Sequence, residues 1–360
     1  MLKAEALTLR AYAHIRLISY FSPNPKDDAA FAGVLALAEV PLDSSLPRAT
    51  NGPTYLAIQK DLDDAITLFG TAGFTPTRAN RIAARALKAR AYALKGDYPN
   101  ALTQANLVIG TTGAPALSTF ATYPAVFTDA AAGETLFKLS RTINQSSQGT
   151  NVGNIYASVD SSINGSPFYE INRALYNALP TGDIRKNVIP DPTSIVDPNY
   201  LTSPNYRTSD VLPVGKHAGL PGRGLLNADF KLIRMSEMHL IKAEAEVAAG
   251  QLLVAGTTLK GLLDRRFSTP QLAPVFATAQ GAWRFILNQR RIEFAYEGYR
   301  FIDLKRLGGA AFANVGIDRH PLDCTAGANC TLPVTDYRFA LPIPTSELNP
   351  NPTIQQNPGY

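Results

Sequence analysis

The densest set of ionisable side chains lies between residues 289 and 308, which read QRRIEFAYEGYRFIDLKRLG. Glu293 and Glu297 stand four residues apart on one face of a helix, where like charges repel each other. Neighbouring arginines must neutralise them if the segment is buried; these are Arg290, Arg291, Arg300 and Arg306. We therefore expect a structural centre here and not a catalytic one. The predicted members of its buried ion network are Arg290, Glu293, Glu297, Arg300 and Asp303.

The local structure of this segment can also be predicted. Apolar spacing indicates a helix from Ala282 to Glu297, with Gly298 as its C-terminal cap because glycine readily adopts the left-handed conformation. A tight return through Tyr299 to Leu304 would then pack the charged groups against aromatic rings. Alanine at the network positions is expected to unfold the protein or lower its yield.

A second set of side chains suits ligand binding. Residues 111–230 are rich in Asn, Ser, Thr, Pro and Gly, lack helical periodicity, and form a segment too long for an ordinary loop. Aromatic rings stack on the C–H face of a sugar, while amides and guanidinium groups bond to its hydroxyls. The alternative is that each ring packs the loops onto the helices. The candidate ligand-binding residues are Tyr156, Phe168, Tyr169, Arg173, Tyr176, Tyr200 and Tyr206.

Enzyme motifs have little support in this sequence. The four histidines occur singly, without H-E-x-x-H, and no G-x-S-x-G is present. Acid pairs such as Glu244 and Glu246 are best explained as solvated helix faces and caps, since two acids adjacent in sequence do not face each other across a cleft as a glycosidase requires. The net charge of +5 comes without a basic cluster, which argues against a nucleic-acid interface. We expect no catalytic residue and no cofactor.

Cys324 and Cys330 are the only cysteines, with five residues between them. They suit a small disulfide, which would place the protein outside the cytosol. A zinc site is the weaker alternative, because His320 gives only a third ligand. No run of about 18 apolar residues is long enough to span a membrane. The first residues already read as helix without a signal peptide, so the protein is either cytosolic or lacks its start.

Helical periodicity organises the rest of the chain. Helices are predicted from residue 2 to about 20, over Tyr55–Phe69, from about 78 to 95, and over Tyr98–Ile109. Further helices are expected over 235–249 and 252–267, and Thr135–Leu139 is a candidate strand. Small residues in the helices around Gly96 and Gly250 are typical of tetratricopeptide-like hairpins. The predicted units are N-terminal hairpins (1–110), an irregular ligand-binding insert (111–230), C-terminal repeats (231–308) and an extended tail packed on the helices (309–360).

Three stretches together resemble the SusD/RagB family of outer-membrane nutrient-binding lipoproteins. The family pattern near the end of the chain is matched by Arg290, Arg291, Glu293, Glu297, Gly298, Arg300, Asp303, Leu304, Arg306 and Gly308. The closing Leu341-Pro-Ile-Pro and Gln356-Asn-Pro-Gly-Tyr360 look like the family's C-terminal signature. Arg234-x-x-Glu237 with Ala243-Glu-Ala245 is similar to its internal helix.

The resemblance implies a mainly α fold, an α-α superhelix of four tetratricopeptide-like hairpins with an irregular insert. It also implies a non-catalytic surface protein that binds glycan and acts as a lid on a SusC-type TonB-dependent transporter, held at the outer membrane by an N-terminal lipid. The lipid-bearing cysteine and early helices of the family are absent here, so a truncated or processed chain is expected. The alternatives are a peptide-binding member of the family and a tetratricopeptide-type protein-interaction scaffold.

Overall fold

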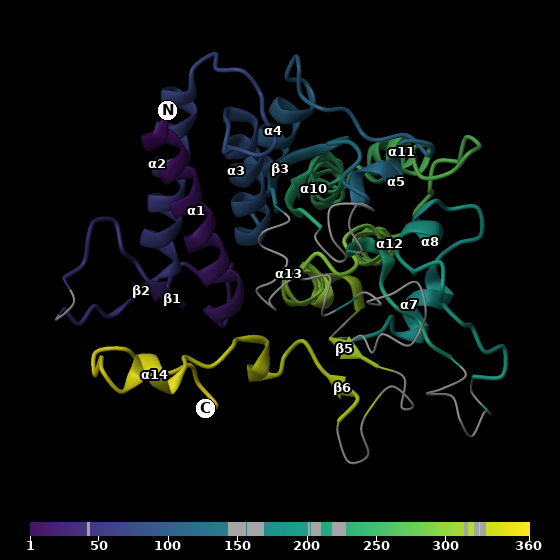
Figure 1. Cartoon of the computed structure of the whole chain (residues 1–360). Helices are drawn as coiled ribbons and strands as arrows, with labels where there is room; N and C mark the ends of the chain where they lie inside the picture. The colour runs from purple at the N-terminus through teal and green to yellow at the C-terminus, as the bar shows by residue number, and fades with distance from the viewer. Residues whose placement is uncertain are drawn as a thin grey trace.

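The computed structural model is mainly helical and describes residues 1–41, 44–142, 156, 169–200, 202, 210–217, 228–312, 316–319, 324 and 329–360. The elements before the insert are α1 (Leu2–Phe21), β1 (Phe31–Val34), β2 (Arg48–Thr50), α2 (Asn51–Phe69), α3 (Arg81–Lys95) and α4 (Tyr98–Ile109). Helix α1 packs on α2, and α3 packs on α4 (Figure 1). The N-terminal hairpins expected from periodicity are therefore present.

Local chemistry explains the α3–α4 hairpin. The Asn80 side chain accepts a hydrogen bond from the Ala83 amide and caps the start of α3. Gly96 ends the helix with a φ of 83°, a left-handed conformation that costs glycine little. The Asp97 side chain then accepts from the Asn100 amide and begins α4. The chain reverses within two residues, as the sequence predicts.

The insert contains only short elements among its described residues. They are α5 (Tyr123–Phe127), β3 (Thr135–Leu139), α7 (Arg173–Ala178), α8 (Arg185–Val188) and the 3₁₀ turn η2 (Gly215–His217). Strand β3 has the predicted bounds and pairs antiparallel with β4 (Phe230–Arg234), which was not predicted. The pairing joins the two ends of the insert, so the intervening loops start and return at the same place.

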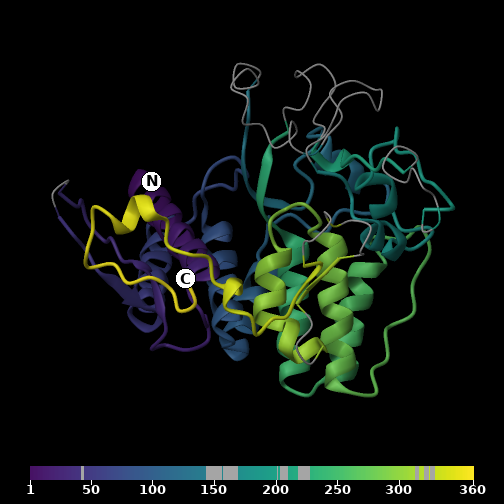
Figure 2. The same ribbon diagram turned by 90° about the horizontal axis from the view of Figure 1, so that it is seen from below.

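The second helical group comprises α10 (Met235–Ala248), α11 (Leu252–Leu263), α12 (Ala279–Glu293) and α13 (Arg300–Phe312). Helix α10 packs on both α4 and α11, and α12 packs on α13, so one continuous layer of helices runs from α1 to α13 (Figures 1 and 2). The apolar core follows this layer, with Met238 and Ile241 of α10 in one cluster and Leu240 and Val247 in the next.

Two predicted helix ends are wrong. Helix α12 ends at Glu293 and not at Gly298, and residues 300–304, expected to be a tight return, open helix α13. The spacing of Leu304, Leu307 and Ala311 fits this helix, and all three are buried in it. Helix α2 begins after Thr50, four residues before the predicted start.

The C-terminal tail lies along the N-terminal helices. It contains β5 (Ile317–Asp318), β6 (Thr331–Leu332), η4 (Tyr337–Phe339) and α14 (Thr345–Leu348). The Leu341 amide donates to the carbonyl of Tyr20 at the end of α1, and the buried Asn357 side chain accepts from Arg48. These bonds hold a proline-rich segment on the surface formed by α1 and β2. Figure 2 shows the yellow tail running beside the purple N-terminal helix. No helix in the described part of the chain is both long and apolar enough to cross a membrane.

Two glycines in α11 give a matched stability test. A Cβ at Gly256 would lie 2.2 Å from the Pro274 carbonyl oxygen, whereas one at Gly261 would meet nothing within 4 Å. We expect Gly256→Ala to lower the free energy of unfolding by about 1–3 kcal/mol through overpacking. Gly261→Ala should raise it by up to about 1 kcal/mol, since alanine favours helix. Urea unfolding of both variants checks this, and equal effects would contradict the close approach of Pro274.

Candidate functional site

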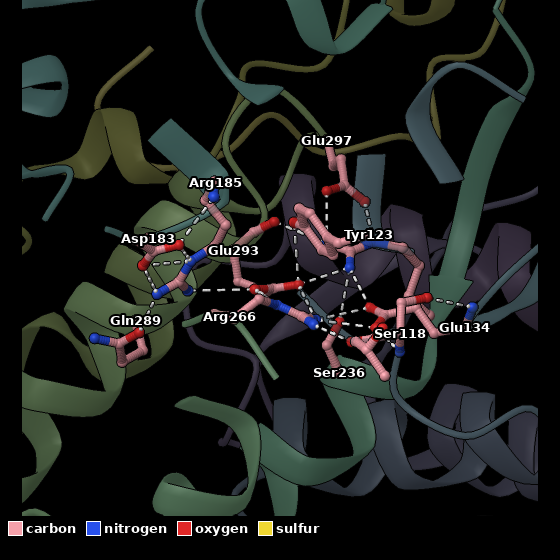
Figure 3. A network of polar contacts seen from close by, with 12 residues as sticks. Ser118, Tyr123, Glu134, Asp183, Arg185, Ser236, Arg266, Gln289, Glu293 and Glu297 are labelled. Carbon is pink, nitrogen blue, oxygen red and sulfur yellow. Dashed lines mark hydrogen bonds and ion pairs between the residues drawn. The ribbon is translucent and has the colours of Figure 1, made fainter. Parts of the chain in front are cut away.

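Glu293 lies at the centre of a buried polar network (Figure 3). Its carboxylate contacts Arg185 at 3.2 Å, Arg234 at 2.7 Å and Arg266 at 2.9 Å. The side chains of all four are at most 1% exposed. The three arginines hold the pKa of Glu293 well below its usual value, against the opposing effect of burial. The carboxylate is therefore charged and structural.

The charges in this network balance. Four carboxylates face four cations, which are Glu134, Asp183, Glu293 and Glu297 with Arg185, Arg234, Arg266 and Lys216. A second buried cluster joins α10, α12 and α13 with two of each sign, which are Glu244 and Asp303 with Arg290 and Arg306. Buried ions are tolerated only when paired in this way. The two clusters fix the insert and the C-terminal helices against one another.

Arg300 does not belong to either cluster, so its predicted place in the buried network is wrong. The Asp303 carboxylate, three residues away on α13, already forms ion pairs with Arg290 at 2.9 Å and Arg306 at 3.0 Å. Arg300 has no ion pair with either carboxylate of the cluster, Glu244 or Asp303. The Nη1 atom of Arg300 is buried without a hydrogen-bond partner among the described residues. Burial, and then the positive charge of Arg291, lower the pKa of Arg300 to about 10.

The turn between α12 and α13 is held on its core side by Lys216, a member of the network around Glu293, and by His217. Lys216 donates to the carbonyls of Glu293 at 2.8 Å and Ala295 at 3.2 Å, which satisfies groups left open at the end of α12. His217 Nε2 bonds to the Tyr296 carbonyl at 2.9 Å. These contacts fix Tyr296 at a φ of 63°, which a residue with a side chain seldom adopts. Strain of this kind is retained where the surroundings over-determine it, often at functional sites.

The opposite side of this turn forms a cavity of about 460 Å³. We call it the tyrosine–arginine cavity. Its lining comes from α1, the insert, helices α12 and α13 with the turn between them, and β5 with the residue that follows it. The lining residues are Tyr20, Tyr156, Asn172, Leu175, Arg291, Phe294, Ala295, Tyr296, Gly298, Arg300, Phe301, Leu304, Ile317 and Arg319.

Aromatic rings form two parts of the cavity wall. The ring of Tyr156 meets that of Tyr296 edge-on, with centroids 5.3 Å apart. On the other part, Phe301 stacks with Tyr20 at 6.1 Å and with Phe339 of the tail at 5.2 Å. Rings packed against each other in this way hold their faces in fixed orientations. The cavity thus combines rigid aromatic surface with guanidinium and amide donors.

Among the predicted ligand-binding residues that the structure describes, Tyr156 alone lines this cavity. Tyr169 touches the Tyr156 ring from outside and is 62% exposed. Arg173 pairs with Asp210 and lies over the rings of Tyr176 and Tyr200, so these side chains pack the insert on itself. Phe168 and Tyr206 lie outside the described residues.

Most of the cavity wall comes from the segment that sequence reasoning assigned to structure alone. Arg291, Tyr296, Gly298, Arg300 and Phe301 face the cavity, while their neighbours Glu293, Glu297 and Asp303 face the core. A usable signal was the excess of basic side chains in residues 289–308, which hold four arginines and one lysine against three acids. Tyr20 and Arg319 carried no such signal, because they reach the cavity from distant parts of the chain.

Two smaller clefts lie beside the tail, with volumes of about 270 and 290 Å³. Both include Lys305, whose Nζ donates to the Ser19 carbonyl at 3.2 Å, and whose pKa burial lowers to about 7. Tyr337 and Phe339 line the larger of the two. Cys324 and Cys330 form a disulfide, as predicted.

Family comparisons cover both ends of the chain. Residues 181–360 match the model described as the SusD family, and residues 1–93 match one described as starch-binding and associating with the outer membrane. The chain is also similar to SusD-like protein P2 of Formosa agariphila, with 26% identity over 389 aligned residues. That alignment covers 99% of this chain and 74% of the relative.

Solved structures share the whole fold. A candidate sugar-binding protein of Bacteroides vulgatus superposes with a TM-score of 0.81 and 28% identity, over 100% of this chain and 77% of that one. A SusD superfamily protein of Bacteroides thetaiotaomicron gives the same TM-score with 25% identity, over 99% and 77% of the two chains. With half of its length matched by the family model and its entire fold shared, this protein belongs to the SusD family, in general a family of carbohydrate-binding proteins.

Proposed function

We propose that the protein binds a glycan in the tyrosine–arginine cavity, without catalysis, and delivers it to a SusC-type TonB-dependent transporter at the outer-membrane surface. The cavity itself carries the proposal. Its volume of about 460 Å³ lies in the range of small-molecule sites, and its apolar lining with a few convergent polar groups is typical of them.

The chemistry of the wall suits a sugar. Tyr156, Tyr296 and Phe301 offer ring surface on which a pyranose can stack. The guanidinium of Arg300 can donate to sugar hydroxyls, while the side-chain oxygen of Asn172 already accepts from the Ala174 amide. A wall of this composition can read both the apolar face and the hydroxyl edge of one saccharide unit.

The same wall supports binding without turnover. None of the residues described as lining the cavity is Asp, Glu, His, Ser or Cys. Glycoside hydrolysis in most enzymes needs two carboxyl groups that flank the scissile bond. The acids of the neighbouring segment, Glu293, Glu297 and Asp303, form buried ion pairs instead. Delivery to a transporter rests on the family's description as associating with the outer membrane.

Tyr156→Ala is expected to weaken glycan binding two- to tenfold, since a well-placed ring contributes about 0.5–1.5 kcal/mol. Affinity electrophoresis and isothermal titration against a panel of polysaccharides and oligosaccharides would measure this. Tyr337→Ala is the matched control, because Tyr337 is 49% exposed and lines the other cleft.

Three outcomes would contradict the assignment. Loss of binding in Tyr337→Ala with Tyr156→Ala unaffected would move the site to the cleft beside the tail. Binding of oligopeptides with silence across the glycan panel would favour the peptide-binding alternative. Retention of a protein partner with no small ligand at all would favour an interaction scaffold.

A further inference from the structure

The tyrosine–arginine cavity is lined by basic side chains and by no acidic ones. Arg291, Arg300 and Arg319 contribute guanidinium groups, and no Asp or Glu is among its described lining residues. At its edge, Arg16 lies over the Tyr20 ring at 4.7 Å and donates to its hydroxyl at 2.5 Å. A concave site with one sign of charge concentrates ligands of the opposite sign.

Arg300 has a buried guanidinium nitrogen without a hydrogen-bond partner among the described residues. This atom is Nη1, and Asp303, three residues away on α13, is shared by two other arginines. Arg291 lies near enough to depress the pKa of Arg300, so the two guanidinium groups repel each other. A buried donor left unpaired costs about 1–3 kcal/mol, and more when it is charged.

An anion in the cavity would relieve this cost. It would accept a hydrogen bond from the Arg300 guanidinium and neutralise its positive charge. A guanidinium group presents a planar fork of donors that fits carboxylate or sulfate oxygens two at a time. A neutral sugar hydroxyl can accept one of these bonds but offers no charge.

We propose that the saccharide bound here carries an anionic group, a uronate carboxylate or a sulfate ester, which Arg300 recognises beside the aromatic wall. The inference rests on the proposed function and adds the substrate class. The aromatic rings would stack on the sugar ring, and the guanidinium groups would hold its charged substituent. Neutral glycans of the same backbone would use only the first of these contacts.

Matched saccharide pairs test the charge requirement. Isothermal titration would compare oligogalacturonates with their methyl esters, and sulfated galactan oligosaccharides with their desulfated forms. The two arms distinguish carboxylate from sulfate. At least one charged member should bind ten or more times tighter than its neutral partner. That preference should shrink with added salt, because screening weakens charge pairs at a partly open site.

Variants of the full chain distinguish a specific contact with Arg300 from a general effect of the protein's positive charge on binding. Arg300→Gln should reduce the preference for the charged member at least tenfold, with Arg319→Gln giving a smaller loss in the same direction. Arg265→Gln removes the same charge at an exposed position outside the cavity and should leave binding unchanged. Thermal unfolding of each variant verifies that the fold is retained.

The outcomes distinguish this inference from the proposed function. If charged and neutral partners bind equally and Arg300→Gln has no effect, the inference is overturned while glycan binding stands. If no saccharide of either class binds, the proposed function fails and the inference fails with it.

Discussion

Replacing Glu293 by alanine is expected to lower the free energy of unfolding by at least about 3–5 kcal/mol, the cost of breaking a buried ion pair by removing one partner. Here one carboxylate serves three fully buried arginines at once. Its removal leaves the network with one uncompensated positive charge in a region closed to water. Because native proteins are stable by only about 5–15 kcal/mol, much of the protein should be unfolded or lost in expression.

Urea unfolding followed by circular dichroism measures this effect, with Asp64→Ala as control. Asp64 is 46% exposed and pairs with Lys60 one helical turn away, so its loss should cost no more than about 1 kcal/mol. A Glu293→Ala protein within 1 kcal/mol of the parent would show that the network does not hold the fold. Binding should be lost only in step with the folded fraction, because Glu293 does not line the cavity.

Acidification from pH 6.5 to pH 4 is expected to remove up to about 3 kcal/mol of stability for each of two histidines, the buried His217 and the partly buried His239. Burial lowers the pKa of His217 and of His239 to about 4. For His217 the bond to the Tyr296 carbonyl opposes this, and the charge of Lys216 adds to it. For His239 the nearby carboxylate of Glu134 only partly offsets the loss of water.

The direction follows from proton binding by the two states. Above pH 6.5 both histidines are neutral whether the chain is folded or not, so they add no pH dependence. Between pH 6.5 and 4 the unfolded chain takes up protons that the folded chain does not, and acid favours unfolding. The pKa of Glu293 is also depressed by its arginines, so its share is lost as well, but only below about pH 4.5.

Chemical denaturation at pH 7.5, 6.5, 5.5 and 4.5 at constant ionic strength checks the pH effect. His239→Leu cannot take up a proton in either state, so its stability should fall about half as much over this range. A parent protein equally stable at pH 7.5 and 4.5 would mean that neither histidine is kept neutral by burial.

The two faces of the α12–α13 turn explain why stability and binding can be separated by mutation. Lys216 and His217 hold the turn from the core side, through the carbonyls of Ala295 and Tyr296. Tyr296 and Arg300 present side chains to the cavity on the other side. Core-side changes should therefore act on folding, and cavity-side changes on affinity.

The sequence by itself determined the elements that depend on neighbours along the chain. Apolar spacing, the Asn80 cap and glycines at 96 and 250 specify helices and their turns through local hydrogen bonds and backbone freedom, and these helices form close to where they were predicted. Charge spacing also indicated that Glu293 and Glu297 need buried arginines. The order of residue types in residues 341–360 also indicated a family resemblance, because that resemblance is a linear pattern along the chain.

Only the tertiary structure decided which arginine forms buried ion pairs in the core and which lines the cavity. Arg290 and Arg300 look equivalent in the sequence, yet Asp303 accepts Arg290 and Arg306 and leaves Arg300 at the wall. Tyr20, Tyr156 and Arg319 meet there from positions about 130 to 300 residues apart. Helix α12 ends at Glu293 because Lys216 and Arg234, distant in sequence, both donate to the carbonyl of this last residue. Such choices depend on groups brought together by folding, and local spacing holds no information about them.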